Sequence, residues 1–341
     1  MTASINHFGV VGGGAWGTAL ALLFNRAGRR VTLWMRSPDL ADQLRKDREN
    51  KAYLPSIKID ARIGITADIT DLTSCDVLVL AVPAQQTRRV CKVLLPYLGD
   101  DKTLIAAGKG IELVTHKLMS EVISEELPGY PVYVLSGPSF AVEIGRGLPS
   151  ALTLAGADGV QAMARAISSP SCRIYTTDDA LGAQIGGAIK NVLAIASGIV
   201  VGRGLGENAR AALMTRGLTE IMRLGNALGA RPQTLMGLSG FGDVVSCCTS
   251  TLSRNMSLGI ALGQGRDLSD ALKSAGGVTE GVATATAVLG LAAMLNVDMP
   301  IVSAVETVLH GRASIDDISS RLLSRPLRHE TEPIFEDLMQ S

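Results

Sequence analysis

One lysine stands alone in a long apolar stretch of this chain. Lys190 lies near the middle of residues 181–201, LGAQIGGAIKNVLAIASGIVV, which contain no other charged residue. Removing a lone ammonium group from water is costly and lowers its pKa, and a desolvated lysine can donate a proton near neutral pH. The alternative is a lysine at the exposed end of a core helix, with its head group in water. Lys190 is therefore a candidate catalytic residue.

A glycine pattern near the start of the chain can bind phosphate groups. Gly12-x-Gly14-x-x-Gly17 lies between a predicted strand and a predicted helix. Such glycines allow a tight turn, a close approach of the backbone to a pyrophosphate, and close packing of helix on strand. The pyrophosphate would meet free N–H groups at the helix N-terminus. The pattern predicts a dinucleotide site, and a turn that serves packing alone is the alternative.

The second predicted strand bears on which dinucleotide is bound. A site selective for NAD usually ends this strand with Asp or Glu, which binds the ribose hydroxyls. Here the strand VTLWMR ends in Arg36, which can pair with a 2′-phosphate or stack on adenine. We therefore expect NADPH to be accepted, unless Arg36 is an ordinary solvated arginine.

Two further groups of residues suggest a substrate site. Lys109 and the turn at Gly137 and Ser139 follow predicted parallel strands, at the edge where open α/β sheets bind ligands. Taken alone, each of these is more often structural. Farther along, Asp243 follows a Gly-Phe-Gly turn, and Ser253 is a predicted N-cap. Arginine in the first helical turn, as at Arg254, is unfavourable unless an anion lies nearby, and a phosphate would be such an anion. An ordinary capped helix is the alternative.

Composition excludes several classes of protein. The 341 residues are enough for two domains, and 32 basic residues balance 32 acidic ones. With no basic stripe and 4% aromatic residues, nucleic-acid binding is not expected. Five cysteines without Cys-x-x-Cys spacing indicate a reduced, cytoplasmic chain with no metal site. We expect all four histidines at the surface.

Two apolar segments could be mistaken for membrane-related sequence. Residues 8–25 are broken by glycines and follow no basic region, so they do not indicate a signal peptide. Residues 181–201 contain Gln184, Lys190 and Asn191, which would be costly inside a bilayer. We expect a buried core helix there and no membrane span.

The order of predicted elements indicates an α/β domain followed by a helical one. The first half alternates between strands and helices as βαβ units do, and strand signals end near residue 178. We therefore predict a Rossmann-type, doubly wound, mostly parallel sheet over residues 1–179 and an all-helical domain over residues 180–341. The expected strands cover residues 5–11, 31–36, 77–83, 103–107, 132–136, 150–154 and 172–175. The expected helices cover residues 15–27, 40–49, 85–95, 116–126, 180–201, 208–228, 253–263, 267–274, 280–295 and 300–311.

Together these motifs resemble a known family, the NAD(P)-dependent glycerol-3-phosphate dehydrogenases of biosynthetic type. The resemblance covers about residues 5–330. It is carried, in this order, by GVVGGGAWGTALA, AVPAQ, AAGKGIE, LSGPSFAVEI, GAIKNVLAIASGI, GLSGFGDVVSCCTSTLSRN and GVTEGVATA. It implies reversible reduction of dihydroxyacetone phosphate to sn-glycerol 3-phosphate by NADPH or NADH, which supplies the backbone of phospholipids. It also suggests a homodimer.

The resemblance implies a role for each matching residue. Lys190 is similar to the catalytic proton donor, Asp243 to the aspartate beside it, and Lys109 to a lysine that contacts both substrate and cofactor. Gly137 and Ser139 match the substrate-contacting turn. The substrate phosphate would be held by Ser253, Arg254 and Asn255. The cofactor would be lined by Gly12, Gly14, Ala15, Trp16, Gly17, Arg36, Lys109, Ala141, Arg254 and Glu280.

Two other functions stay open. A hydroxyacid or ketopantoate reductase would share this fold and a catalytic lysine. However, hydroxyacid enzymes typically carry asparagine four residues after that lysine, where this chain has Ala194, and the asparagine here is adjacent at Asn191. A nucleotide-binding protein without enzymatic activity is the second alternative. It would leave the grouping of Lys109, Lys190, Asp243 and Arg254 unexplained.

Overall fold

The chain folds as two compact units. The computed structural model describes residues 5–326, and its chain divides into a first unit, residues up to Glu112 with Lys117–Gln184, and a second unit, Leu113–His116 with Ile185 onward. The first unit contains an eight-stranded sheet, and helices alone form the second unit as far as it is described. The predicted fold class is thereby confirmed.

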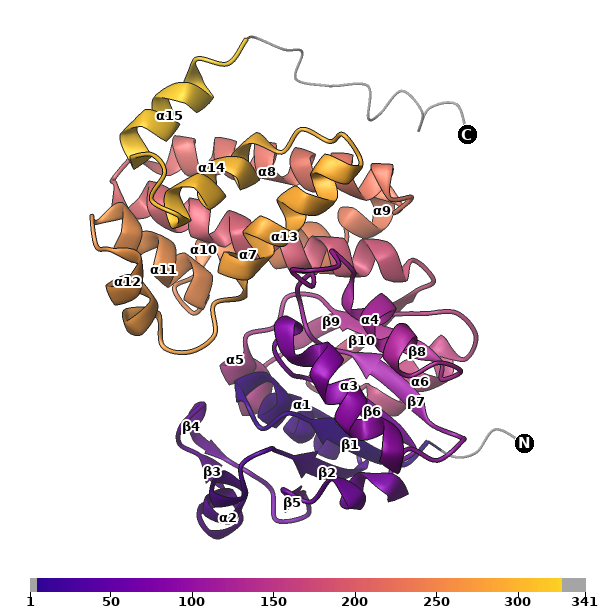
Figure 1. Cartoon of the computed structure of the whole chain (residues 1–341). Helices are drawn as coiled ribbons and strands as arrows, with labels where there is room; N and C mark the ends of the chain where they lie inside the picture. Colours follow the sequence, from indigo (N-terminus) through magenta and orange to yellow (C-terminus); the bar gives the residue numbers. More distant parts are fainter. Residues whose placement is uncertain (1–4, 327–341) are drawn as a thin grey trace. The chain divides into compact units, whose positions relative to one another are not determined.

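The sheet of the first unit has the order β10-β9-β8-β7-β6-β1-β2-β5 (Figure 1). All neighbouring strands are parallel except β8 and β9, which are antiparallel. All seven predicted strands are present, and the three-residue β5 was missed. The strands are β1 (His7–Val11), β2 (Arg30–Trp34), β5 (Gly64–Thr66), β6 (Val77–Leu80), β7 (Thr103–Ala106), β8 (Val132–Ser136), β9 (Ser150–Ala155) and β10 (Cys172–Thr177).

The central strands are apolar on both faces because helices cover both sides of the sheet. In β6, Val77 and Val79 join one buried cluster while Leu78 and Leu80 join the other. Successive side chains of a strand point to opposite faces, so a continuous apolar run is what a doubly covered strand requires. The sequence pattern at residues 77–83 was interpreted in this way, and the structure confirms it.

Six α-helices and a small hairpin complete the first unit. The helices are α1 (Ala15–Arg26), α2 (Pro38–Asp47), α3 (Thr87–Leu94), α4 (Met119–Glu126), α5 (Ala141–Arg146) and α6 (Val160–Ile167). The hairpin is formed by β3 (Glu49–Asn50) and β4 (Leu54–Lys58). The sequence analysis missed the hairpin, α5 and α6, all of which are short. It also began α4 three residues too early, because residues 112–117 form a loop closed by a bridge between Ile111 and Leu118.

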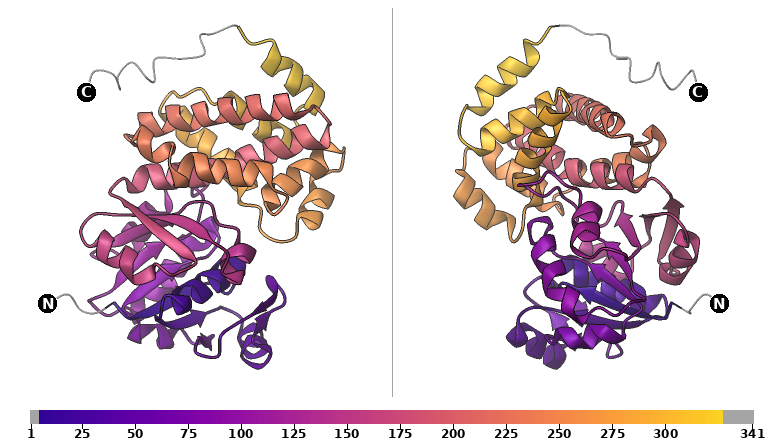
Figure 2. Two further views of the ribbon diagram at one scale, coloured as in Figure 1. Left: turned by 180° about the vertical axis from the view of Figure 1, so that it is seen from behind. Right: turned by 45° about the vertical axis from the view of Figure 1, so that its right-hand side comes forward.

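The second unit consists of helices and loops (Figure 2). Each predicted helix in this region is present, with ends within two residues of those expected, whereas α9, α10 and α15 were not predicted. The helices are α7 (Ala180–Gly202), α8 (Glu207–Ala227), α9 (Pro232–Leu235), α10 (Asp243–Thr249), α11 (Arg254–Gly263), α12 (Leu268–Ala275), α13 (Glu280–Met294), α14 (Pro300–Leu309) and α15 (Ile315–Leu323).

Helix α7 is the core of the second unit. By length and composition it is the one helix of residues 5–326 that could cross a membrane, yet 89% of its most apolar window is buried inside the protein. The prediction of a buried core helix is confirmed. Its backbone touches α11 directly, since a Cβ on Gly198 would lie 2.2 Å from the Met256 carbonyl oxygen and one on Gly259 would lie 2.0 Å from that of Ile195. These glycines therefore set how closely α11 approaches α7.

One prediction about histidines is wrong. His7 is 6% exposed rather than on the surface. Its Nδ1 donates to the Ser74 carbonyl oxygen at 3.1 Å and its Nε2 lies 2.9 Å from Thr32 Oγ1. Burial lowers its pKa, and the ring is a structural part of the amino end of β1. His329 lies outside the described residues.

Candidate active site

The glycine turn joins β1 to α1, as the sequence predicts. Gly12 has a φ of +127°, and a Cβ on Gly17 would lie 1.8 Å from the Gly12 carbonyl oxygen, so both positions need glycine for the fold itself. Gly14 is different. Its φ is −77°, and no described residue lies within 4 Å of where its Cβ would be. Neither packing nor a positive φ requires glycine here, and the open space beside this N-cap leaves room for the predicted ligand.

The other predicted cofactor residues of the first unit lie at the ends of its elements. Trp16, in the first turn of α1, donates from Nε1 to the Ala107 carbonyl oxygen at 3.0 Å. Arg36 is exposed just beyond β2, and Ala141 begins α5. Arg254 and Glu280, which the resemblance also assigns to the cofactor, belong to the second unit as the first residues of α11 and α13.

Lys109, Gly137 and Ser139 come together at the carboxyl ends of β7 and β8. These strands are parallel neighbours, so their following loops leave from the same edge of the sheet. The Lys109 ammonium donates to the Gly137 carbonyl oxygen at 2.7 Å and to Ser139 Oγ at 3.1 Å. The Ser139 hydroxyl in turn donates to the Gly137 oxygen at 2.8 Å. Ser139 does not cap α5, whose N-cap residue is Phe140.

Lys190 lies on α7 and is buried beside two side chains of α10. Its Nζ is 3.1 Å from Asp243 Oδ1 and 2.8 Å from Cys247 Sγ, and the Cys247 thiol lies 3.6 Å from the same carboxylate oxygen. Asp243 is 0% exposed and Lys190 7%. Asp243 starts α10 directly after a π-helical turn at Leu238–Gly242, which contains the predicted Gly-Phe-Gly turn.

The expected direction of the Lys190 pKa is wrong. Burial alone would lower it, but attraction to Asp243 and the contacts with Cys247 outweigh burial and raise the pKa above its ordinary value. Lys190 is therefore a buried ammonium ion at neutral pH. The error arose because the nearest opposite charge lies 53 residues away in the sequence.

Cys247 is a neighbour of Lys190 that the sequence analysis missed. It was counted there only as one of five cysteines that indicate a reduced chain without a metal site, and not as part of a site. Its spacing from Asp243 was an available signal, because residues four apart on a helix share one face. All five cysteines are free thiols.

The start of α11 carries the predicted phosphate-binding residues. Ser253 is the N-cap, as predicted, and its Oγ accepts from the Met256 N–H at 3.3 Å. Asn255 donates from Nδ2 to Asn191 Oδ1 at 2.9 Å and accepts from the Gly281 N–H at 3.1 Å. One amide therefore ties α11 to α7 and α13, which leaves Asn255 a single further N–H for a ligand.

Arg254 is half-buried and lies against the loop before α13. A Cβ on Gly277, whose φ is +105°, would lie 3.0 Å from the Arg254 Nη1 atom. The guanidinium thus packs over bare backbone at the N-terminal end of a ten-residue helix. Its positive charge adds there to that of the helix dipole.

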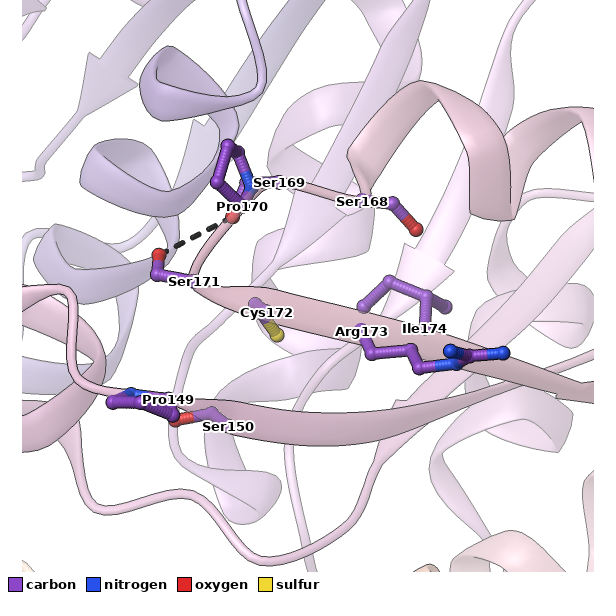
Figure 3. Close-up of a pocket in the computed structure, with 9 residues that line it drawn as sticks. All are labelled: Pro149, Ser150, Ser168, Ser169, Pro170, Ser171, Cys172, Arg173 and Ile174. Atoms are coloured by element: carbon purple, nitrogen blue, oxygen red, sulfur yellow. Dashed lines mark hydrogen bonds between the residues drawn. The ribbon is translucent and has the colours of Figure 1, made fainter.

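A pocket of about 570 Å³ lies elsewhere on the first unit, at residues 149–150 and 168–174 (Figure 3). Its serine hydroxyls bond nearby protein atoms, with Ser169 Oγ and Ser171 Oγ 3.3 Å apart and Ser168 donating to the Ala164 carbonyl oxygen. It contains none of the predicted site residues. Among residues 5–326, no group of three His, Cys, Asp or Glu side chains could hold a metal ion.

The fold and the two groups of side chains define a class, a dinucleotide-binding α/β unit with a helical unit that carries a buried lysine. Comparison with known proteins narrows the class. Residues 7–162 match the model of the NAD-dependent glycerol-3-phosphate dehydrogenase N-terminus, and residues 179–320 match that of its C-terminus. The chain belongs to the NAD-dependent glycerol-3-phosphate dehydrogenase family.

Individual relatives agree over nearly the whole chain. Glycerol-3-phosphate dehydrogenase [NAD(P)+] of Parvibaculum lavamentivorans is 47% identical, over 97% of this chain and all of that protein. The enzyme of the same name from Rhodospirillum rubrum is 49% identical, over 97% and 95%. The crystal structure of glycerol-3-phosphate dehydrogenase from Coxiella burnetii is 34% identical with a TM-score of 0.91, over 95% of this chain and all of that one.

Proposed function

We propose that this chain reduces dihydroxyacetone phosphate to sn-glycerol 3-phosphate, reversibly, with NADPH or NADH. The observation that carries the proposal is the buried ammonium of Lys190, held by Asp243 and Cys247. Reduction of a ketone places negative charge on its oxygen, and a positioned, protonated lysine can neutralise that charge. Membership of the family supports the choice of substrate.

The glycine turn fits the cofactor that this reaction needs. The open space at Gly14 admits a pyrophosphate against the N-terminus of α1, and Ala15, Trp16 and Gly17 form the first helical turn there. Arg36 supports NADPH as a cofactor through its charge and exposure. We assign Lys109, Ala141, Arg254 and Glu280 to the same cofactor. When bound, the nicotinamide supplies the hydride.

The residues of this chain supply the proton and bind the substrate. Lys190 donates a proton from Nζ to the developing alkoxide and takes it back in the reverse reaction. Asp243 keeps that ammonium charged and oriented. Lys109, fixed by Gly137 and Ser139, adds a second positive charge for the substrate.

The substrate phosphate is assigned to the start of α11. Arg254 supplies a guanidinium, Ser253 a hydroxyl hydrogen and Asn255 its remaining N–H, alongside the free backbone N–H groups of the first turn. The positive charge of Arg254 is repelled by the positive N-terminal end of the helix dipole. A bound phosphate offsets this repulsion, because it is attracted to both.

We also propose a domain boundary, a cellular location and an oligomeric state for this enzyme. We place the domain boundary between residues 179 and 180; the start of the C-terminal family match at residue 179 supports this, whereas the two compact units divide between residues 184 and 185. The free thiols agree with a cytoplasmic enzyme. A homodimer is proposed on the family resemblance, and the partners are small molecules rather than nucleic acid.

The test is oxidation of NADPH and of NADH by the purified protein with dihydroxyacetone phosphate, and unphosphorylated dihydroxyacetone is the control. We expect turnover with the phosphorylated ketone alone. Nucleotide binding without turnover would contradict the proposal and favour a hydroxyacid or ketopantoate-type reductase, or a nucleotide-binding protein without activity.

A second test addresses the cofactor site. Gly14→Val should abolish NADPH binding with only a modest loss of stability, because its side chain would enter open space although valine is a poorer N-cap than glycine. Gly99→Val is the matched control, since Gly99 is also unobstructed but lies on an exposed loop. Equal NADPH affinity in the two variants would place the cofactor elsewhere.

A further inference from the structure

The β3–β4 hairpin, which has no part in the proposed chemistry, packs beside the glycine turn. Figure 1 shows it next to α2. Its side chains at Leu54 and Ile57 lie against α5, where a Cβ on Gly145 would come within 3.2 Å and 2.9 Å of them. The hairpin also contacts α1. It is therefore a fixed part of the first unit.

Asn50, at the end of β3, is fully buried, and its side-chain amide forms hydrogen bonds to the glycine turn and to α1. Its Nδ2 donates to the Gly13 carbonyl oxygen at 2.9 Å and to Thr18 Oγ1 at 2.8 Å. Its Oδ1 accepts from the Tyr53 N–H at 3.3 Å. Both amide hydrogens are thus used. A buried polar side chain with fully used donors holds its partners in one arrangement.

The two residues that Asn50 bonds, Gly13 and Thr18, flank Gly14 in the sequence. A trans peptide unit is planar, with its C=O and N–H on opposite sides. Fixing the Gly13 carbonyl oxygen toward Asn50 therefore fixes the Gly14 N–H in the opposite direction. That N–H belongs to the group at a helix N-terminus that has no intrahelical acceptor. The second bond, to Thr18, anchors the same amide to α1 and does not act on the Gly13–Gly14 peptide.

We propose that Asn50 is a positioning residue of the dinucleotide site, which sets the direction of the Gly14 N–H for the pyrophosphate. The inference rests on the proposed function, which assigns the cofactor to this turn. A hydrogen bond of this kind is worth about a tenfold change in an equilibrium constant. Asn50→Ala should therefore raise the Kd for NADPH about tenfold.

The competing account is that Asn50 only anchors the hairpin to α1. Two variants separate the accounts. Thr18→Val removes the Asn50–Thr18 bond at nearly constant volume and leaves the Gly13 carbonyl bond in place. Asn25→Ala removes a second buried asparagine, which lies on α1 at the end far from the glycine turn and accepts from Arg62 at 3.2 Å. Both should lower the Tm.

The experiment measures the Kd for NADPH by fluorescence titration, together with the Tm, for the whole chain. We expect a Kd about tenfold higher in Asn50→Ala, and Kd values within about twofold of wild type in Thr18→Val and Asn25→Ala. If the Kd of Asn50→Ala rises no more than in those two controls, the inference is overturned and Asn50 is an anchor.

A measurement on the unaltered protein covers the case in which Asn50→Ala does not fold. In protein labelled with ¹⁵N-asparagine, the side-chain NH₂ resonances of Asn50 should shift on titration with NADPH, because they bond the carbonyl oxygen inside the turn. Those of Asn25 should stay in place. Unshifted Asn50 resonances at saturating NADPH would overturn the inference.

The outcome also distinguishes this inference from the proposed function. Wild-type protein that binds neither NADPH nor NADH overturns both. Wild-type binding that is lost in Gly14→Val but unchanged in Asn50→Ala overturns this inference alone.

Discussion

The glycine turn of the first unit and the Lys190–Asp243 ion pair of the second unit are positioned by different forces. The turn is set by backbone geometry, with Gly12 and Gly17 required by packing and Asn50 bonded to a carbonyl oxygen. Lys190 is held by charge, in a buried contact with Asp243. A backbone site can bind an anion without moving any charged side chain. A proton donor needs a counter-charge, since burial alone would neutralise it.

The sharpest test of this difference is Lys190→Ala. Loss of a positioned general acid costs about 10²- to 10⁴-fold in rate, and we expect a loss of kcat in that range. The Kd for NADPH should stay at the wild-type value, because the turn does not depend on this charge. Loss of nucleotide binding in this variant would show that the role of Lys190 is misassigned.

Asp243→Asn tests whether charge holds the lysine. With the carboxylate gone, burial dominates and the pKa of Lys190 falls, so reductive activity should be lost at lower pH than in wild type. Breaking a buried pair also costs about 3–5 kcal/mol of stability. The measurement is kcat against pH, together with the Tm.

Cys247→Ser is the matched control for Asp243→Asn. It replaces the other contact of Lys190 by a hydroxyl and leaves the carboxylate in place, so its pH profile should stay near that of wild type. A profile for Asp243→Asn that also superimposes on wild type would mean that Asp243 does not govern the ionisation of Lys190.

Glu220, on α8, is a buried carboxylate held by backbone rather than by a lysine. It accepts from the N–H groups of Ile301 at 2.6 Å and Val302 at 3.2 Å, and burial raises its pKa to about 7. Between pH 4.5 and 7 the folded state binds a proton that the unfolded state has lost, so stability should fall as pH rises. The change is on the order of 3 kcal/mol.

Glu220→Gln should remove this pH dependence, because glutamine does not titrate. The measurement is the free energy of unfolding by urea at pH 5 and pH 7. If the free energy of unfolding of the variant falls between pH 5 and pH 7 as much as that of wild type, other groups cause the pH dependence.

Arg254→Ala should have the smallest effect of the set. It removes one of several donors assigned to the substrate phosphate, so we expect KM for dihydroxyacetone phosphate to rise about tenfold with a smaller change in kcat. Initial rates over a range of substrate concentrations measure both. An unchanged KM would remove Arg254 from the phosphate site.

Much of the fold could be predicted, and the omissions are mostly elements without a clear period. Apolar runs and glycines identified seven of the eight strands of the sheet, the core helix α7 and the turn before α1. The three-residue β5, the two-residue β3 and the six-residue α5 are too short to show a period of their own, and β4 buries Leu54 and Ile57, three residues apart, instead of every second residue. Asn50 lies in the β3–β4 hairpin, so its role was invisible in the sequence.

The sequence by itself determined most of the elements, the glycine turn, the capped helix at Ser253 and the isolation of Lys190, because each depends on local geometry or on composition within a few residues. Tertiary structure alone decided what those residues meet. It placed Asp243 and Cys247 against Lys190 and reversed the expected direction of its pKa. It also placed Asn50 on the Gly13 carbonyl. The physical reason is that hydrogen bonds and electrostatic forces act over distances in space, whatever the separation along the chain.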